Sequence, residues 1–358
     1  MNKLQETIRL IEGVDTRAEK QMEQHINSLT KPLGSLGSLE SLAIKLAGIG
    51  RSTQPEIDPA TVIVMAADHG VTKEGVSAFP SEVTKQMLHN FMNEGAAINV
   101  LAQVANASVE VVDIGVKENI ELPGLINKKV RLGTNNMMAG PALTREEAIA
   151  ALETGIEVAE GAIQKGAKLI ALGEMGIGNT TASSAILSVL GQTSIENVVG
   201  VGTGINHEDK ERKIQVIKQA IKINQPNPHD PIDVLGKVGG LEIAGLAGVV
   251  LGAAATRIPV LLDGFITSVA ALTAVRINPV CEQYLIASHQ SVEPGHIVVN
   301  QLLGLQPLID LNLRLGEGSG AALALPIVRS AVHIVHNMAT FEEAKISGAK
   351  DGSLKGNT

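Results

Sequence analysis

Short apolar runs bounded by turn residues recur through the middle of this chain, with helical patterns between them. The runs are rich in Val, Ile and Leu and lack polar alternation, which is typical of strands buried on both faces of a sheet. They lie at residues 61–67, 109–114, 168–172, 198–201, 259–262 and 284–287. Strands that alternate with helices pair in parallel through right-handed crossovers. The pattern therefore predicts an α/β fold in which helices flank a parallel sheet.

The residue composition agrees with this fold class. The chain has no Trp, one Tyr and four Phe, so its core must be built from Ala, Val, Ile, Leu and the nine Met residues. An all-β sandwich would normally contain more aromatic residues, in strands that alternate apolar with polar residues. Glycine occurs 37 times, well above ordinary usage. This abundance indicates that glycines lie in functional loops, where the backbone conformation matters.

Helical patterns occupy both ends of the chain. Apolar residues recur at helical spacing before residue 50, and residues 321–343 are again helical in pattern. Both ends lie outside the series of alternating strands and helices. We therefore expect a small helical domain from residues 1–50 plus 330–358, and a large α/β catalytic domain from residues 51–329.

Charge and cysteine content exclude several classes of protein. The formal net charge of −8 argues against a nucleic-acid or anionic-membrane surface. The single cysteine, Cys281, excludes an intrachain disulfide framework and a Cys-x-x-Cys motif, and a cytoplasmic location is the simplest expectation. Residues 1–15 are too polar for a signal peptide. The longest apolar stretch, residues 243–255, is shorter than the roughly 18 residues of a membrane span, so we predict a buried helix.

A polar loop with a glycine follows almost every predicted strand. Ligands of open parallel sheets bind beyond the carboxyl ends of the strands, so these loops together predict a shared ligand cleft. The loops are residues 68–71, 173–181, 202–206, 263–265 and 288–291. Several of their glycines precede predicted helices, where a bare backbone and a helix N-terminus favour an anion such as phosphate: Gly176, Gly178, Gly202 and Gly204.

For Lys213, and for Asp68 with His69, position in the sequence favours an ordinary structural role over ligand binding. Lys213, about two turns into the helix that follows Asn206, would be a solvated surface lysine unless it turns back toward the loop. Asp68 and His69 would make hydrogen bonds at a strand end rather than ligate a metal. No H-E-x-x-H or other metal motif occurs, and we predict neither a metal nor a cofactor.

Glu317 is the strongest candidate for a reacting group. It stands between Gly316 and Gly318 at the start of an Ala-rich helix, so a ligand could reach its carboxylate. A helix N-terminus favours the charged carboxylate and burial opposes it, and a carboxylate between these effects can act as a general base near neutral pH. A plain capping carboxylate explains the pattern equally well. Glu174, beside a glycine at a strand end, is a second candidate of the same kind.

The common nucleotide-binding motifs are absent or out of context. The chain has no G-x-x-x-x-G-K-[ST] sequence, and a G-x-G-x-x-A match at residues 316–321 is followed by too little chain for a dinucleotide-binding unit. The paired acids and glycine-threonine loop of diphosphate-using phosphoribosyltransferases are also missing as a unit. A nicotinamide-dependent oxidoreductase is therefore disfavoured.

Several segments together resemble the nicotinate-nucleotide–dimethylbenzimidazole phosphoribosyltransferase family over nearly the whole chain. They are KPLGSLG at 31–37, ADHGV at 67–71, GEMG at 173–176, NQPNP at 224–228, LLDGF at 261–265 and RLGEGSGAAL at 314–323. The last segment is long and specific. The resemblance implies a Rossmann-like sheet, a homodimer, and a reaction that needs no magnesium or other cofactor.

The resemblance also implies a reaction in cobalamin synthesis. An imidazole nitrogen of 5,6-dimethylbenzimidazole attacks C1′ of nicotinate mononucleotide, nicotinate leaves, and α-ribazole 5′-phosphate forms with inversion. In this scheme Glu317 takes the imidazole proton and Glu174 assists. The alternative is a non-catalytic protein of the same fold that binds benzimidazole nucleosides, although such a protein would have no use for a base.

Substrate-binding residues follow from the same resemblance, position by position. The phosphate and ribose of the donor would contact Gly176, Gly202, Thr203, Gly204, Lys213, Asp263, Gly264 and Ser291. The benzimidazole would lie in an apolar slot near Phe79, Pro80, Met87, Met175 and Leu315, with Gln86 beside Met87. The resemblance thus makes Lys213 a ligand of the phosphate rather than a surface lysine.

Overall fold

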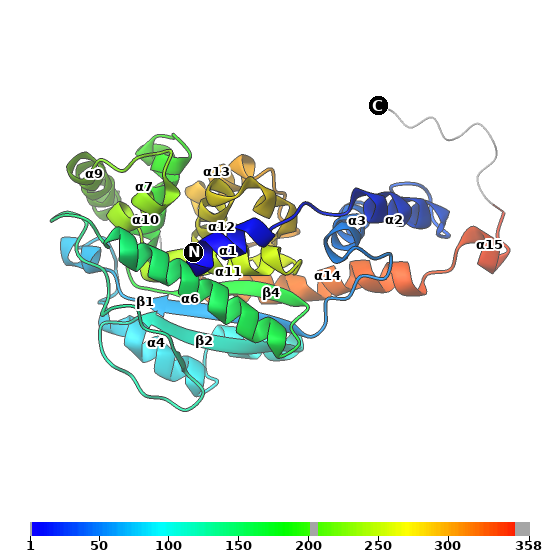
Figure 1. The fold of residues 1–358 in the computed structure, drawn as a ribbon, viewed down its shortest axis with the longest axis horizontal. Helices are drawn as coiled ribbons and strands as arrows, with labels where there is room; N and C mark the ends of the chain where they lie inside the picture. The colour runs from blue at the N-terminus through cyan, green and yellow to red at the C-terminus, as the bar shows by residue number, and fades with distance from the viewer. Residues whose placement is uncertain (1, 201–206, 348–358) are drawn as a thin grey trace. The chain divides into compact units, whose positions relative to one another are not determined.

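The computed structural model describes residues 2–200 and 207–347 (Figure 1). The chain divides into two compact units, Met1–Glu12 with Asp58–Ala324 and Gly13–Ile57 with Leu325–Thr358. The first helix, α1 (Lys3–Leu10), belongs to the larger unit, although we expected it in the helical domain. Its Lys3 forms an ion pair with Glu160 of α6 (Arg145–Gln164), at 2.7 Å.

A six-stranded parallel sheet forms the centre of the larger unit, as predicted. Its order is β3-β2-β1-β4-β5-β6, the order of a doubly wound sheet. The strands are β1 (Ala60–Ala67), β2 (Ala107–Gly115), β3 (Ile126–Asn127), β4 (Leu169–Met175), β5 (Val260–Leu262) and β6 (Leu285–Ala287). Every residue of β1 is buried, which explains its unbroken apolar sequence. The chain order reverses between β1 and β4, and such reversal opens a crevice at the carboxyl ends of these strands.

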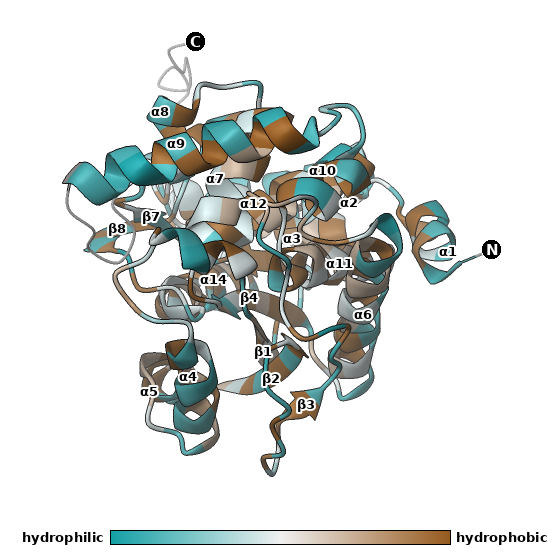
Figure 2. Cartoon of the chain, turned by 90° about the vertical axis from the view of Figure 1, so that its left-hand side faces the viewer, coloured by the Kyte–Doolittle hydropathy of each residue, from teal (hydrophilic) through white to brown (hydrophobic). Residues whose placement is uncertain are grey.

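Helices cover both faces of this sheet. Figures 1 and 2 show α6 and α11 on one side of β1, β2 and β4, with α4 on the other side. The helices are α4 (Glu82–Met92), α5 (Ala97–Val104), α7 (Asn179–Leu190), α8 (Ile195–Val198), α9 (His207–Asn224), α10 (Pro231–Val238), α11 (Leu241–Ala255), α12 (Phe265–Ile277) and α13 (Pro294–Leu302), with 3-10 turns η1 (Gly70–Glu74) and η2 (Pro279–Tyr284). The predicted buried helix at residues 243–255 is confirmed as α11, in which residues 241–254 are all buried. A capping box formed by Thr144 and Glu147 begins α6.

Two sequence predictions about strands were wrong. Residues 198–201 do not form a strand in the part of the chain that is described, because Val198 ends the short helix α8 and packs as an apolar turn against α7 and α13. A separate two-stranded parallel sheet, β7 (His289–Ser291) with β8 (Ile309–Leu313), was not predicted. β7 is entirely polar, and β8 alternates apolar with polar residues, so neither strand shows an unbroken apolar run.

The smaller unit brings helices from the two ends of the chain into contact, as expected. It contains α2 (Thr16–Ser28), α3 (Ser38–Gly50), most of α14 (Ser319–Asn337) and α15 (Phe341–Ala344). Asp15 caps α2 by accepting hydrogen bonds from the backbone N–H groups of Arg17 and Ala18. His25 contacts the carbonyl oxygen of Val335 at 2.9 Å, which ties α2 to α14.

One helix among the described residues, α14, is long and apolar enough to cross a membrane. Its apolar residues recur every three or four positions on one buried face: Leu325, Val328, Ala331, Val332 and Val335. This spacing is typical of the core-facing stripe of an amphipathic helix. We therefore interpret α14 as a core helix.

Candidate active site

A cavity of about 290 Å³ opens at the carboxyl ends of β4 and β5. It is lined by Phe79, Val83, Met87, Glu174, Met175, Gly176, Ile177, Asn179, Thr180, Gly264, Phe265, Ile266, His289, Ser291, Glu293, Arg314, Leu315, Gly316 and Glu317. Both predicted carboxylates, Glu317 and Glu174, are among these residues. The cavity also brings together most of the predicted binding residues, from segments far apart in the sequence.

The Glu317 side chain enters the cavity from a turn in which the backbone is left-handed, a conformation that is rare for residues other than glycine. Gly316, Glu317 and Gly318 have consecutive φ angles of 92°, 66° and 88°. A non-glycine residue in the left-handed region costs about 1–3 kcal/mol and is commonly found at functional sites. The buried Glu317 carboxylate accepts a hydrogen bond from the backbone N–H of Ile98, at 3.4 Å and at the start of α5. Burial raises the pKa of Glu317, and this N–H partly opposes the rise.

Asp263, not Glu317, caps the helix that follows this turn. Asp263 Oδ1 accepts hydrogen bonds from the N–H groups of Gly320 at 2.7 Å and Ala321 at 3.1 Å, and Oδ2 accepts from Gly318 at 3.1 Å. The plain capping explanation for Glu317 is therefore wrong. Burial raises the pKa of Asp263 to about 7, although the three N–H groups favour its charged form. Asp263 lies outside the cavity lining and holds the Glu317 turn in place.

Glu174 lies at the end of β4 beside Glu317. Its side chain is buried and accepts a hydrogen bond from Asn179, the first residue of α7. Burial and the nearby charges of Asp263 and Glu242 raise the pKa of Glu174 to about 8. Gly316 has a φ of 92°, a conformation that favours glycine, and a Cβ there would also overlap Glu174 Oε1. Glu174 is therefore a neutral carboxylic acid near pH 7.

The N-termini of two helices also border the cavity. α7 begins at Asn179 and Thr180, and α12 begins after Gly264, so backbone N–H groups and positive dipole ends of both helices lie there. Lys213 approaches from α9 and donates a hydrogen bond from Nζ to Thr180 Oγ1 at 2.6 Å. This arrangement suits an anion such as phosphate.

Lys213 is buried, which overturns the expectation of a solvated surface lysine drawn from its position. Only 1% of the residue is exposed, because α9 packs this position toward α7, whereas the preceding residues Glu211 and Arg212 face solvent. Figure 2 shows the hydrophilic residues along the outer surface of α9. Burial lowers the pKa of Lys213 to about 8, and the Glu293 carboxylate opposes this change.

Large apolar side chains form the mouth of the cavity. Phe79 is 48% exposed and Leu315 is 54% exposed, and both line the opening together with Met87 and Met175. Exposed apolar groups around a small cavity are typical of a binding site for a flat apolar ring. Pro80 and Gln86 are exposed and lie outside the cavity lining. Gly202, Thr203 and Gly204 lie outside the described residues.

The predicted cleft loops at residues 173–181, 263–265 and 288–291 contain the cavity residues Asn179, Thr180, Phe265 and His289, although sequence reasoning did not single them out. It missed Val83 and Arg314. Asn179 and Thr180 had a usable signal, since they directly follow the glycines that begin a helix. His289 follows a predicted strand, and its ring packs where a Cβ on Gly320 would stand. In the part of the chain that is described, no group of three or more His, Cys, Asp or Glu side chains could hold a metal ion.

Comparison with known proteins assigns the chain to a family. The profile of a family described as Phosphoribosyltransferase matches residues 11–346. The chain belongs to this phosphoribosyltransferase family. A family member from Halalkalibacterium halodurans, named nicotinate-nucleotide–dimethylbenzimidazole phosphoribosyltransferase, is 72% identical over 98% of each chain. A protein of the same name from Alkaliphilus metalliredigens is 51% identical over 97% of this chain and all of its own length.

A solved structure of this family has the same fold. It is the nicotinate-nucleotide–dimethylbenzimidazole phosphoribosyltransferase from Thermus thermophilus, which is 45% identical to this chain. The TM-score is 0.89, and the match covers 94% of this chain and 100% of the other. The predicted Rossmann-like architecture is thereby confirmed.

Proposed function

We propose that this phosphoribosyltransferase moves the 5-phosphoribosyl group of nicotinate mononucleotide to 5,6-dimethylbenzimidazole. The products are α-ribazole 5′-phosphate and nicotinate, and the reaction serves assembly of the cobalamin nucleotide loop. The observation that carries the proposal is the buried Glu317 carboxylate, presented on a left-handed turn to a cavity with an apolar mouth. The curated relatives, which match the chain over nearly its whole length, carry the name of this activity.

Proton transfer in this reaction falls to Glu317. One imidazole nitrogen forms a bond to C1′, and the bond from C1′ to the nicotinate nitrogen breaks, leaving its electron pair on nicotinate. The N–H proton of the other imidazole nitrogen passes to the Glu317 carboxylate, a contribution of about 10²–10⁴ in rate. Burial and neighbouring charges raise the pKa of Glu174 to about 8, so Glu174 stays protonated near pH 7 and the role of base is assigned to Glu317.

The donor phosphate is proposed to bind at the helix N-termini. Lys213 and the hydroxyl of Thr180 would supply a cation and a donor, and Gly176, Gly264 and Ser291 would admit the phosphoribosyl group close to the backbone. Contacts with Gly202, Thr203 and Gly204 remain predictions from the family resemblance. Asp263 was predicted to contact the ribose. Because it accepts hydrogen bonds from the backbone of Gly318 and Gly320, we propose instead that it supports the Glu317 turn.

The benzimidazole is proposed to lie between Phe79, Met175 and Leu315, with its ring N–H toward Glu317. Val83 and Met87 complete the apolar wall. Pro80 and Gln86 do not line the cavity, so their contact with the base remains a prediction from the family resemblance. We also propose a cytoplasmic homodimer that acts on small molecules without nucleic acid, membrane or cofactor.

A nicotinate-release assay tests the proposed activity. Purified protein is incubated with nicotinate mononucleotide, with dimethylbenzimidazole present or omitted, and nicotinate is quantified by chromatography. Release that depends on the base is the expected result. Release without base would indicate a hydrolase, and no release from folded protein that still binds benzimidazole nucleosides would favour the non-catalytic binding protein.

A further inference from the structure

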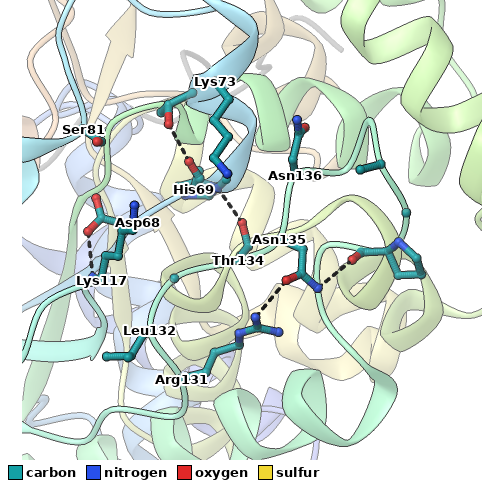
Figure 3. A pocket seen from close by; sticks show the side chains of 16 residues that line it. Asp68, His69, Lys73, Ser81, Lys117, Arg131, Leu132, Thr134, Asn135 and Asn136 are labelled. Atoms are coloured by element: carbon teal, nitrogen blue, oxygen red, sulfur yellow. Dashed lines mark hydrogen bonds between the residues drawn. The ribbon is translucent and has the colours of Figure 1, made fainter.

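Histidine side chains line two separate cavities of the larger unit, and the two rings differ in what their Nε2 atoms contact. His69 lines a polar cavity of about 590 Å³ (Figure 3), and its Nε2 lies 2.5 Å from a carboxylate oxygen of the buried Glu242. His289 lines the catalytic cavity and is 3% exposed. Its Nε2 makes no hydrogen bond to any residue in the ranges 2–200 and 207–347. A ligand in the catalytic cavity could therefore supply the partner of this nitrogen.

The His289 ring is held beside the helix that follows the Glu317 turn. A Cβ on Gly320, in the first turn of that helix, would overlap the ring at Nδ1 and Cε1. Asp263 Oδ1, which accepts from the N–H of Gly320, lies 3.8 Å from Nδ1. Toward the cavity, a Cβ on Gly264 would lie 3.9 Å from Nε2, and glycine at this position leaves the Nε2 edge of the ring accessible.

The contacts of Ser288 indicate which ring nitrogen of His289 carries the proton. Ser288 Oγ donates its single proton to the carbonyl oxygen of Asp263 at 3.2 Å, because a carbonyl oxygen can only accept. The same Oγ lies 3.2 Å from His289 Nδ1, so both contacts are hydrogen bonds only when an Nδ1–H group donates to Oγ. The Asp263 carboxylate also favours a proton on Nδ1. Burial lowers the pKa of His289, so the ring is neutral near pH 7 and its Nε2 is an acceptor.

An acceptor at this position requires a hydrogen-bond donor from the ligand. A fully ionised phosphate group has no hydrogen to donate, whereas the ribose of a nucleotide presents two hydroxyl groups. His289 and Ser291 are two residues apart in β7, so their side chains leave the strand on the same face, and both line the cavity. The family resemblance places Ser291 at the phosphoribosyl group. These observations favour a ribose hydroxyl as the partner of Nε2.

We propose that His289 Nε2 accepts a hydrogen bond from a ribose hydroxyl of the nucleotide donor and so selects a ribosyl over a deoxyribosyl donor. The proposal rests on the proposed phosphoribosyl transfer and names a specificity-determining residue for it. Since the His289 ring lies against the helix that follows the Glu317 turn, this hydrogen bond positions C1′ relative to the general base. A site with a buried acceptor discriminates against an analogue without the hydroxyl, because the acceptor is then left unpaired.

His289→Asn is the main test. The asparagine amide can keep the hydrogen bond to Ser288 Oγ in place of Nδ1–H, but it has no atom at the position of Nε2. In the nicotinate-release assay, kcat/KM is measured for wild type and variant with nicotinate mononucleotide and with its 2′-deoxy and 3′-deoxy analogues. The preference for the parent donor in the wild type, divided by the same preference in the variant, isolates the contact, because the intrinsic reactivities of the donors cancel. We expect this quotient to be about threefold to tenfold for one analogue and near one for the other.

His289→Gln is the matched control. Its longer side chain can place an amide oxygen near the position of Nε2, so it should retain preference for the parent donor that His289→Asn loses. A packing role would change kcat/KM for the parent and the deoxy donors by the same factor in either variant. Circular dichroism melting establishes that each variant is folded.

Nuclear magnetic resonance of the wild type tests the protonation pattern without any substitution. The two nitrogens of a histidine labelled with ¹⁵N have distinct chemical shifts according to which one carries the proton. We expect one histidine in the Nδ1–H form to change its Nε2 shift when nicotinate mononucleotide is added. The same resonance should be absent from the spectrum of a folded His289→Asn.

A quotient within about twofold of one for both analogues, in a folded His289→Asn, would overturn the proposal. If neither variant folds, the wild-type spectrum decides, and the absence of an Nδ1–H histidine that responds to the donor would overturn the proposal. Failure of the wild-type protein to release nicotinate from the parent donor would instead contradict the proposed function itself. The two failures are therefore distinguishable.

Discussion

At the scale of single residues, the chemistry of the catalytic cavity depends on which of its neighbouring carboxyl groups are ionised. Asp263 is held by three backbone N–H groups, Glu242 by His69, Glu174 by Asn179 and Glu317 by the N–H of Ile98. Burial raises the pKa of Asp263, Glu174 and Glu317, so these three groups do not all ionise near neutral pH. Glu174 keeps its proton at pH 7, which leaves Glu317 to act as the base.

Glu174→Gln tests this division of charge through stability. The pKa of Glu174 is about 8 in the folded protein, against an ordinary value near 4.3 in an unfolded chain. Between these values the folded state binds more protons than the unfolded state, so the wild type loses stability as pH rises through this window. Glutamine cannot ionise, so we expect the Tm of the variant to rise relative to wild type between about pH 5 and pH 8. A Tm difference that does not change with pH, measured by circular dichroism, would contradict the assigned charge.

Lys213→Met tests the proposed phosphate site at the same scale. Methionine fills the buried space of the lysine stem but removes the cation. A charge-assisted hydrogen bond is worth about 1.5–3 kcal/mol, so KM for nicotinate mononucleotide should rise about tenfold or more while kcat changes less. Lys218→Met is the control, because Lys218 lies on the same helix and pairs with Glu196 at the surface. An unchanged KM in Lys213→Met would remove this residue from the phosphate site.

At the scale of elements, glycine lets two helices of the larger unit pack closely. A Cβ on Gly155 of α6 would overlap the carbonyl oxygen of Gly245 in α11, and one on Gly248 would overlap the carbonyl oxygen of Leu152. Backbone therefore meets backbone between these helices, and α11 in turn packs on the sheet that carries the cavity. This contact fixes the position of Glu242 at the start of α11.

Gly155→Ala should destabilise the protein for this reason. Overpacking a close contact typically costs about 1–3 kcal/mol, which urea unfolding would measure. Gly161→Ala on the same helix is the control, because a Cβ there would meet nothing within 4 Å. Alanine improves helix propensity, so Gly161→Ala should stabilise by about 0.5–1 kcal/mol. Equal effects of the two substitutions would contradict the close helix contact.

Elements also show how far the sequence predicts the structure. Buried parallel strands such as β1 were predicted because their apolar runs are long and unbroken. Residues 198–201 misled us, because four apolar residues suit a turn of helix as well as a short strand. The strands β7 and β8 were not predicted because neither contains an unbroken apolar run.

The candidate site was predictable only in part, for reasons that lie in the tertiary fold. Glu317 stood out because it lies between two glycines, and Glu174 because it lies beside a glycine at the end of a predicted strand. The burial of Lys213 is invisible among charged neighbours, and His69 and Glu242 meet across 173 residues of chain. No local sequence pattern predicts the contact between His69 and Glu242, since it depends on how α11 packs against the sheet.

At the scale of the whole molecule, the chain consists of two compact units and is proposed to act as a homodimer. We expect sedimentation equilibrium to give the mass of two chains of 37.3 kDa at micromolar concentration. The expectation comes from the family to which the chain belongs. The mass of one chain over this concentration range would contradict it, without affecting the assignment of Glu317.

The most direct test of the account is base-dependent nicotinate release by wild-type protein and by Glu317→Gln, measured side by side with saturating substrates. Glutamine preserves the size of the side chain and its place on the left-handed turn, but it cannot accept the imidazole proton. We predict that the wild type releases nicotinate only with dimethylbenzimidazole, and that the variant is about 10²–10⁴ slower while remaining folded. Equal rates for the two proteins would contradict the assignment of Glu317 as the general base.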